Sequence, residues 1–428
     1  MMVRADGFAP AEGPGSMVTV GGAGHPPPPG QVLRPYGGRA GPPTFESDAG
    51  RAEGCMNVGL PRMHKEAGER RDFLPRFVSV LDAAGAATIT LEEGYGSGME
   101  VPADAYVAAS PKVRFGTYEE CLDRDLIVVV RCPGERILRA LRPGATLLSM
   151  LHYPSWPARA SLLADMGVRA VSMDGIVDDQ GRRLIEAIEA VGWNGVQAAF
   201  REIAIVHPMF GHPGRRPLHV TCLGAGAVGG HAIRAATRYG DPQLREELVS
   251  KRVPGVEVTV ADFDLTWHED YMLSRLQRTD LLIDATQRLD YSRPVIPNEW
   301  IAAMPPDAVL LDLSADTYDF TATPPKTKGI EGIPEGDLDR WVFHEDDPAY
   351  ERLDPRVRTA NRRLALSCYA WPGLKPWQCM ETYGSQLEPV VEMILADPQA
   401  AWDPESGHYE QRAVARAEVT TWLRAAAA

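Results

Sequence analysis

The glycine-rich segment at residues 224–229 carries the clearest chemical signal in the chain. It reads Gly-Ala-Gly-Ala-Val-Gly, directly after a predicted strand, His219–Leu223, and before a predicted helix, Ala232–Tyr239. In such a motif the first glycine permits a tight turn, the second lets the backbone approach a pyrophosphate, and the third brings helix and strand together. The helix N-terminus also stabilises phosphate charge. The residues predicted to bind a dinucleotide here are Gly224, Gly226, Val228 and Gly229.

A carboxylate after the next predicted strand, Val256–Val260, bears on the choice of cofactor. Asp262 can accept hydrogen bonds from the adenosine ribose and would repel a 2′-phosphate, so we expect NAD rather than NADP. Asp264 is the alternative ribose ligand. The spacing from the glycines exceeds the usual ~20 residues because Asp241–Pro254 is predicted to be an inserted loop. Ala285, which ends another predicted strand, is also assigned to the cofactor site.

Composition and charge exclude several classes of protein. The chain has 428 residues with 44 basic and 58 acidic side chains, and its formal net charge of −14 argues against nucleic acid or an acidic membrane as a partner. No apolar run reaches the ~18 residues of a membrane helix, and no secretory signal is apparent. The six cysteines lack metal-site spacing, so reduced thiols are expected. We therefore expect a cytoplasmic protein that acts on a small molecule without a bound metal.

The order of elements predicts an α/β fold. Residues 1–55 are rich in glycine and proline, so they are expected to form a disordered tail. Short buried strands then alternate with helices, which is typical of parallel sheets. The further predicted strands are Thr88–Leu91, Leu126–Val130, Thr146–Leu151, Ala170–Met173, Leu281–Ala285 and Val309–Leu313. The further predicted helices are Phe77–Ala84, Leu184–Val206, Met380–Leu395 and Gln411–Ala426.

Several motifs, spread in order over residues 56–398, resemble the alanine dehydrogenase and saccharopine dehydrogenase superfamily. The shared motifs are His64–Arg71 closed by Pro75, Arg131-Cys132-Pro133 after a buried strand, Leu141–Gly144 followed by Leu151-His152, and Trp371–Pro376. Two more segments, Asp178–Arg183 and Leu311–Thr317, resemble the saccharopine branch in particular.

The resemblance implies two Rossmann-like domains, with a dinucleotide-binding domain inserted into a split substrate domain. The expected ranges are 56–205 for the first part of the substrate domain, 206–360 for the NAD-binding domain, and 361–428 for C-terminal helices that return to the substrate domain. The family chemistry is the passage of a hydride between nicotinamide and the carbon of a C–N bond.

Three residues match family positions with known roles. Arg70 matches an arginine that binds the substrate carboxylate, and the guanidinium fork suits that contact; its neighbour Arg71 is the alternative. His152 matches a histidine that does acid/base or substrate-orienting work, which suits an imidazole that titrates near neutrality. Asp316 matches an acidic residue near the nicotinamide ribose or substrate, and a helix N-cap is its structural alternative.

The chain departs from the family at Arg131, where the family has a catalytic lysine. Lysine can lose its proton when it is desolvated, whereas arginine stays charged. Three interpretations follow: His152 carries proton transfer alone, Arg131 binds a substrate carboxylate, or Lys65 supplies the amine.

Together these features predict a NAD-dependent oxidoreductase that acts on the C–N bond of an amino acid. The saccharopine-like segments favour a secondary amine or imine as substrate. The alternatives are oxidative deamination of a small amino acid, as in alanine dehydrogenases, and a nucleotide-binding scaffold that lost catalysis with its lysine. The expected partner is a small amino acid or 2-oxo acid, and a homo-oligomer is left open.

Overall fold

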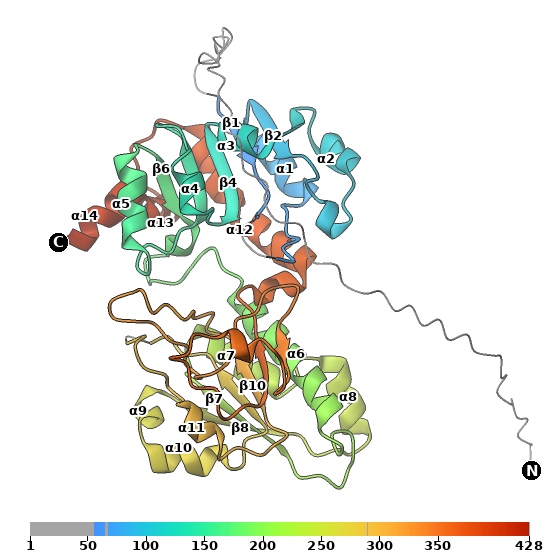
Figure 1. Cartoon of the computed structure of the whole chain (residues 1–428). Helices are drawn as coiled ribbons and strands as arrows, with labels where there is room; N and C mark the ends of the chain where they lie inside the picture. The colour runs from blue at the N-terminus through green and yellow to red at the C-terminus, as the bar shows by residue number, and fades with distance from the viewer. Residues whose placement is uncertain (1–54, 65–66, 289, 428) are drawn as a thin grey trace, which may run out of the picture. The chain divides into compact units, whose positions relative to one another are not determined.

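Two β-sheets of six strands organise the computed structural model, which describes residues 55–64, 67–288 and 290–427 (Figure 1). The predicted tail therefore lies almost wholly outside the described residues. In the first sheet the order is β3-β2-β1-β4-β5-β6, and every pair is parallel. Its strands are β1 (Asn57–Leu60), β2 (Thr88–Glu92), β3 (Val113–Gly116), β4 (Leu126–Arg131), β5 (Thr146–Met150) and β6 (Arg169–Ser172).

The second sheet has the order β11-β12-β10-β9-β7-β8. All its pairs are parallel except β11 with β12. Its strands are β7 (Leu218–Leu223), β8 (Val256–Ala261), β9 (Leu281–Asp284), β10 (Val309–Asp312), β11 (Val342–Phe343) and β12 (Leu364–Ser367). The central strands are apolar and buried, as expected when helices cover both faces of a parallel sheet. The predicted α/β class with two Rossmann-like sheets is confirmed.

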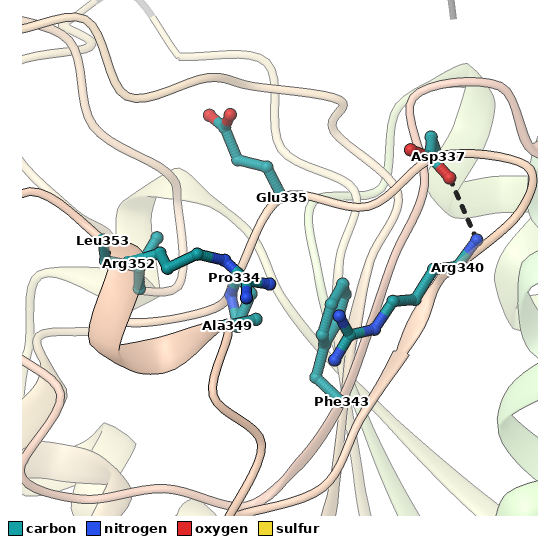
Figure 2. Close-up of a pocket in the computed structure, with 8 residues that line it drawn as sticks. All are labelled: Pro334, Glu335, Asp337, Arg340, Phe343, Ala349, Arg352 and Leu353. Atoms are coloured by element: carbon teal, nitrogen blue, oxygen red, sulfur yellow. Dashed lines mark hydrogen bonds between the residues drawn. The ribbon is translucent and has the colours of Figure 1, made fainter. Parts of the chain in front are cut away.

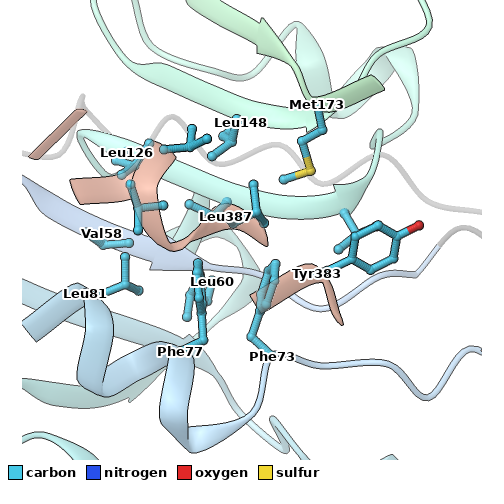
Figure 3. Packing of buried hydrophobic residues seen from close by; sticks show 14 of the residues in the cluster. Val58, Leu60, Phe73, Phe77, Leu81, Leu126, Leu148, Met173, Tyr383 and Leu387 are labelled. Atoms are coloured by element: carbon cyan, nitrogen blue, oxygen red, sulfur yellow. The ribbon is translucent and has the colours of Figure 1, made fainter. Parts of the chain in front are cut away.

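Helices from both ends of the described chain pack on the first sheet. Figure 3 shows Phe77 and Leu81 of α1 (Pro75–Ala83) and Leu387 of α12 (Pro376–Ala396) in one core with strand residues. Pro75 suits the first turn of α1, and Gly85 follows its end with a φ of +96°, which glycine adopts without strain. The other helices beside this sheet are α2 (Ala103–Ala109), α3 (Tyr118–Leu122), α4 (Glu135–Leu138), α5 (Pro157–Asp165), α13 (Tyr409–Ala417) and α14 (Val419–Ala427).

The long helix α6 (Ile188–Val206) packs on the second sheet through α7 (Ala227–Ala236) and β10. It has to approach α7 closely, because a Cβ on Gly192 would lie 2.8 Å from the backbone nitrogen of Ala232. The remaining helices of this part are α8 (Pro242–Ser250), α9 (Phe263–Thr266), α10 (Glu269–Leu276) and α11 (Asn298–Ile301).

The structure differs from the sequence-based expectations in several elements. The glycine motif itself opens α7, which begins at Ala227 rather than at residue 232, and α6 begins at Ile188 rather than at residue 184. The expected loop at 241–254 is helix α8, because Asp241 caps it by accepting hydrogen bonds from the backbone nitrogens of Gln243 and Leu244.

Two differences concern the C-terminal part. The single helix expected at 411–426 is broken at Glu418, whose carboxylate accepts the backbone amides of Thr420 and Thr421. The expected boundary at residue 360 placed residues 364–367 with the C-terminal helices of the substrate domain. Instead they form strand β12, which pairs with β10 in the second sheet. The chain re-enters the core of the first sheet only with α12.

Candidate active site

The first sheet has a topological switch point between β1 and β4. From β1 the chain continues to β2 and β3 on one side, whereas β4, β5 and β6 extend the sheet on the other. Ligands of open parallel sheets bind at the carboxyl ends of the strands beside such a point. The residues after β1, β4 and β5 therefore frame the candidate substrate site, and Arg131 and His152 both lie there.

His152 forms a hydrogen-bonded pair with a carboxylate that sequence reasoning missed. Its Nδ1 lies 3.1 Å from Oδ2 of Asp174, and its backbone nitrogen donates to Oδ1 of the same residue. Asp174 follows β6, the neighbour of β5, and its Oδ1 also accepts the hydroxyl of Ser172. Half of the His152 side chain is exposed, whereas 6% of that of Asp174 is. An acidic residue just after the next predicted strand was the available signal.

Electrostatics fix the charge of this pair. Burial alone would raise the pKa of Asp174, but the hydrogen bonds and charge of His152, with the hydroxyl of Ser172, lower it to about 2. Asp174 is thus ionised at neutral pH and orients the imidazole through Nδ1. Nε2 of His152 has no hydrogen-bond partner within the described part of the chain, so it is the nitrogen that can meet a substrate.

Arg131 is the last residue of β4 and reaches toward the second sheet. One of its guanidinium nitrogens donates to the backbone oxygen of Tyr369, at 3.3 Å, just beyond β12. Its charge also contributes to lowering the pKa of the Glu69 carboxyl, which burial raises and Arg71 lowers more strongly. Arg131 thus lies near the segment around residue 70, and the shared role of the two in substrate binding stays a prediction.

The two neighbouring arginines have different surroundings. Arg71 is buried, and its Nε and Nη2 lie 2.8 and 2.6 Å from the two carboxylate oxygens of Glu69. Its charge is therefore already balanced inside the protein. Arg70 is exposed and forms no ion pair with any other described residue, so it keeps a free fork for a carboxylate. Lys65, the third predicted substrate ligand, lies outside the described residues.

In the second sheet the glycine motif has the geometry of a phosphate loop. Gly224 has a φ of +84°, and a Cβ on Gly229 would lie 2.2 Å from the oxygen of Gly224. A Cβ on Gly226 would meet nothing within 4 Å, so this glycine leaves open space where a pyrophosphate would approach. Val228 lies in the first turn of α7 and packs on the core, and the nitrogen of Ala285 donates to Leu223 beside the turn.

Asp262 lies at the end of β8, the strand that pairs with β7, beside the glycine turn. It follows β8 directly, and the preceding Ala261 accepts the backbone amide of Gly224 at 3.0 Å. Its carboxylate is exposed and caps α9 by accepting the amide of Phe263. Asp264 is also exposed but lies two residues further, inside α9. The residues present thus fit a dinucleotide with an unphosphorylated ribose, which favours Asp262 over Asp264.

Asp316 belongs to a buried ionic network at the carboxyl edge of the second sheet. Its carboxylate lies 2.7 Å from Nη2 of Arg288, and no helix begins there, so the N-cap alternative is wrong. Burial raises the pKa of Asp316, and Arg288 opposes this rise. Lys328, 1% exposed, donates to the Asp312 carboxylate and to the backbone oxygen of Asp316. The sequence analysis missed Asp312, Arg288 and Lys328, because their pairing depends on the folded loops.

A cavity of about 310 Å³ lies elsewhere, in the loops around β11 (Figure 2). Its lining residues are Pro334, Glu335, Asp337, Arg340, Phe343, Ala349, Arg352 and Leu353. None of the predicted site residues contributes to it. Within the described part of the chain no cluster of three or more histidine, cysteine or acidic side chains could hold a metal ion, and no helix could cross a membrane.

Comparisons with known proteins name alanine dehydrogenases repeatedly. Residues 59–188 match the family model for the alanine dehydrogenase/PNT N-terminal domain. Alanine dehydrogenase from Geobacillus stearothermophilus is 22% identical over 304 residues, which cover 69% of this chain and 77% of the relative. The enzyme from Mycobacterium tuberculosis (strain CDC 1551 / Oshkosh) is 26% identical over 275 residues, covering 61% and 73%. The chain is thus similar to alanine dehydrogenases along much of its length.

A solved L-alanine dehydrogenase structure shares the fold of this chain. The TM-score is 0.62 at 19% identity, and the match covers 85% of this chain and 94% of the other. These relatives are amino-acid dehydrogenases by name, in agreement with the expected class of enzyme. The relatives favour the alanine dehydrogenase alternative over the secondary-amine reaction that the saccharopine-like segments indicated.

Proposed function

We propose that the chain catalyses NAD-dependent oxidative deamination of a small amino acid and the reverse amination of a 2-oxo acid. The observation that carries the proposal is the His152–Asp174 pair at the carboxyl edge of the first sheet, in a chain similar to alanine dehydrogenases. NAD, when bound, accepts the hydride that leaves the α-carbon. The glycine loop, Asp262 and Ala285 would hold it.

Each remaining role follows from the surroundings of a side chain. Arg70 binds the α-carboxylate, because its guanidinium is exposed and unpaired within the described residues. His152 exchanges a proton with the reacting substrate through Nε2, while Asp174 keeps the ring oriented and stabilises its charged form. The Asp316–Arg288 pair lies in the second sheet, which would bind the cofactor. Lys328 holds this pair in place by donating to the backbone oxygen of Asp316.

Arg131 cannot replace a lysine base, because a guanidinium stays protonated. A fixed positive charge there fits a substrate with a second carboxylate, which an acidic amino acid or an opine-like secondary amine would carry. Oxidation of such a secondary amine is the second candidate function, and Arg131 is the one residue that favours it.

A substrate panel tests the proposal. Pyruvate, glyoxylate and 2-oxoglutarate are each combined with ammonium, lysine, ornithine or glutamate, and NADH oxidation is followed by absorbance. Turnover with ammonium supports deamination of a primary amine. Turnover with lysine, ornithine or glutamate alone would replace it with the secondary-amine reaction. NADH binding without turnover for any pair would contradict both and support a scaffold role. The variant His152→Asn is the control for contaminating dehydrogenases.

A further inference from the structure

A second histidine–carboxylate pair lies at the same edge of the first sheet. Nε2 of His64 is 2.6 Å from Oε1 of Glu92, and 53% of the histidine side chain is exposed. His64 follows β1 and Glu92 ends β2, so the pair adjoins the switch point between β1 and β4. We propose that His64 is a second proton-transfer residue, which does the work that Arg131 cannot do; this inference rests on the proposed deamination.

The carboxylate of this pair is held in one orientation. Oε2 of Glu92 accepts the backbone nitrogen of Arg62 at 2.7 Å, which leaves Oε1 for His64. Glu92 is buried, and Nε2 of His64 donates to its Oε1 in the tautomer that carries the proton on Nε2. Nδ1 of His64 has no hydrogen-bond partner among the residues described. The pair thus repeats the arrangement of His152 and Asp174, with one ring nitrogen anchored and the other available.

An aromatic ring and several charged side chains surround His64. The ring of Tyr118, in α3, meets it edge-on with centroids 5.1 Å apart. Burial, followed by the charge of Glu92, raises the pKa of Tyr118 to about 12, so its hydroxyl stays neutral. The other charged neighbours are Arg62 and the Asp72 carboxylate with which it pairs. Burial raises the pKa of Asp72 to about 6, and Arg62 and the amide of Gly96 oppose that rise.

Position also suits a shared substrate. In the sheet β4 alone separates β1 from β5, so the strands that precede the two histidines are two strand spacings apart, about 10 Å. Strand ends at that spacing can frame one small amino acid. Tyr118 lies between the His64 pair and the end of β4, because its phenol is also near Cys132, the residue after Arg131.

Deamination needs proton transfer at two atoms. The α-ammonium loses a proton before the C–H bond breaks and the hydride leaves to the nicotinamide, which forms the C=N bond. Water then forms the C–O bond and loses two protons in all, while the nitrogen regains one before the C–N bond breaks. The products are the 2-oxo acid, ammonia, NADH and two protons. One imidazole exchanges protons with the substrate nitrogen, and the other exchanges protons with the oxygen that comes from water.

The first test needs no turnover. The full chain with 13C-labelled histidine is saturated with NADH, and pyruvate is added without ammonium. The histidine signals are assigned by loss of single peaks in His64→Asn, His152→Asn and His219→Asn. We expect pyruvate to shift the His64 and His152 signals and to leave His219 unchanged. His219 is a matched control, since it pairs with Glu257 at 3.4 Å but lies at the amino end of the second sheet.

The second test uses the reaction found in the substrate panel. We expect His64→Asn to lower kcat about 100-fold with a melting temperature close to that of the parent, and Glu92→Gln to lower it less. His219→Asn should keep full activity. A shift of His152 without His64, or an unchanged kcat in His64→Asn, would overturn this inference and leave the proposed function intact. If neither histidine shifts with pyruvate, nor with glyoxylate or 2-oxoglutarate in its place, the proposed function is wrong and the inference falls with it.

Discussion

The carboxyl edges of the two sheets contain similar side chains used in opposite ways. On the first sheet His152 and His64 are each half exposed, with the partner carboxylate buried behind the ring. On the second sheet Lys328 and Asp312 are both buried and paired with each other at 2.6 Å, while backbone amides and glycines face the open space. Both edges are formed by the carboxyl ends of parallel strands, so the fold alone does not decide which edge does chemistry.

The difference separates proton transfer from binding. A ring that is anchored on one side and open on the other can change its protonation state while a substrate is bound. A buried ion pair holds its charge and its geometry, so it can only position the loop around it. The first edge is therefore suited to moving protons, and the second to holding a cofactor in one place.

The largest expected effect is on the first edge. His152→Asn should lower kcat at least about 100-fold, because the residue that exchanges a proton with the substrate is lost. NADH affinity, measured by fluorescence titration, should stay within about twofold, since the second sheet is untouched. A loss of NADH binding in this variant would show that the two edges are not separable in this way.

Next come two substitutions in the glycine loop. Gly229→Ala places a Cβ 2.2 Å from the oxygen of Gly224, so it should both weaken NADH binding and lower the melting temperature. Gly226→Ala adds a Cβ where nothing lies within 4 Å, so it should weaken NADH binding at least about tenfold without loss of stability. Equal melting temperatures for the two variants would contradict the close packing of α7 on the turn.

Arg131→Lys tests whether this residue of the first edge binds the substrate or transfers protons. A point charge replaces a planar fork, so we expect KM for a dicarboxylic substrate to rise about tenfold with little change in kcat. Steady-state kinetics with a monocarboxylic substrate is the control, and its KM should change less. A strong increase in kcat instead would mean that the position is still an acid/base site.

Asp262→Ala tests the binding edge at the adenosine end. Removal of the exposed carboxylate should weaken NADH binding several-fold and reduce the difference between the affinities for NADH and NADPH. Asp264→Ala is the matched control, and we expect it to leave both affinities unchanged. Tighter binding of NADPH than NADH by the parent protein would refute the assignment.

Much of this arrangement could be predicted from the sequence because its signals are local. Apolar runs marked most of the central strands, and glycine spacing marked the turn after β7. Helix α8 had a local signal too, an aspartate before a proline, which was overlooked. Asp174 and Glu92 could not be paired with their histidines, since those contacts require β6 beside β5 and β2 beside β1. Lys328 lies in a predicted loop, and its burial depends on tertiary packing.

The smallest expected effect concerns Asp284, at the end of β9 in the second edge. Burial first, and then the charge of Asp312, raises the pKa of Asp284 to about 6. Its Oδ1 accepts the amide and hydroxyl of Thr286, but Oδ2 is buried with no partner and lies against Gly329. An ionised carboxylate in that place costs folding free energy.

The sign of the pH dependence follows from the raised pKa. An aspartate in the unfolded chain titrates near ~3.9, so between about pH 4 and 6 only the folded state holds the proton. The stability that this proton provides is fully present below about pH 4 and is lost as the pH rises through 6. Asp284→Asn keeps an acceptor for Thr286 and removes the charge, so it should raise the melting temperature by roughly 2 °C at pH 8 and leave it nearly unchanged at pH 4.5. Asp346→Asn, at an exposed position, is the control. A lower melting temperature for Asp284→Asn at pH 8 would mean that the charge of Asp284 stabilises the loops of the second edge. The two edges would then differ only in how exposed their ionisable side chains are.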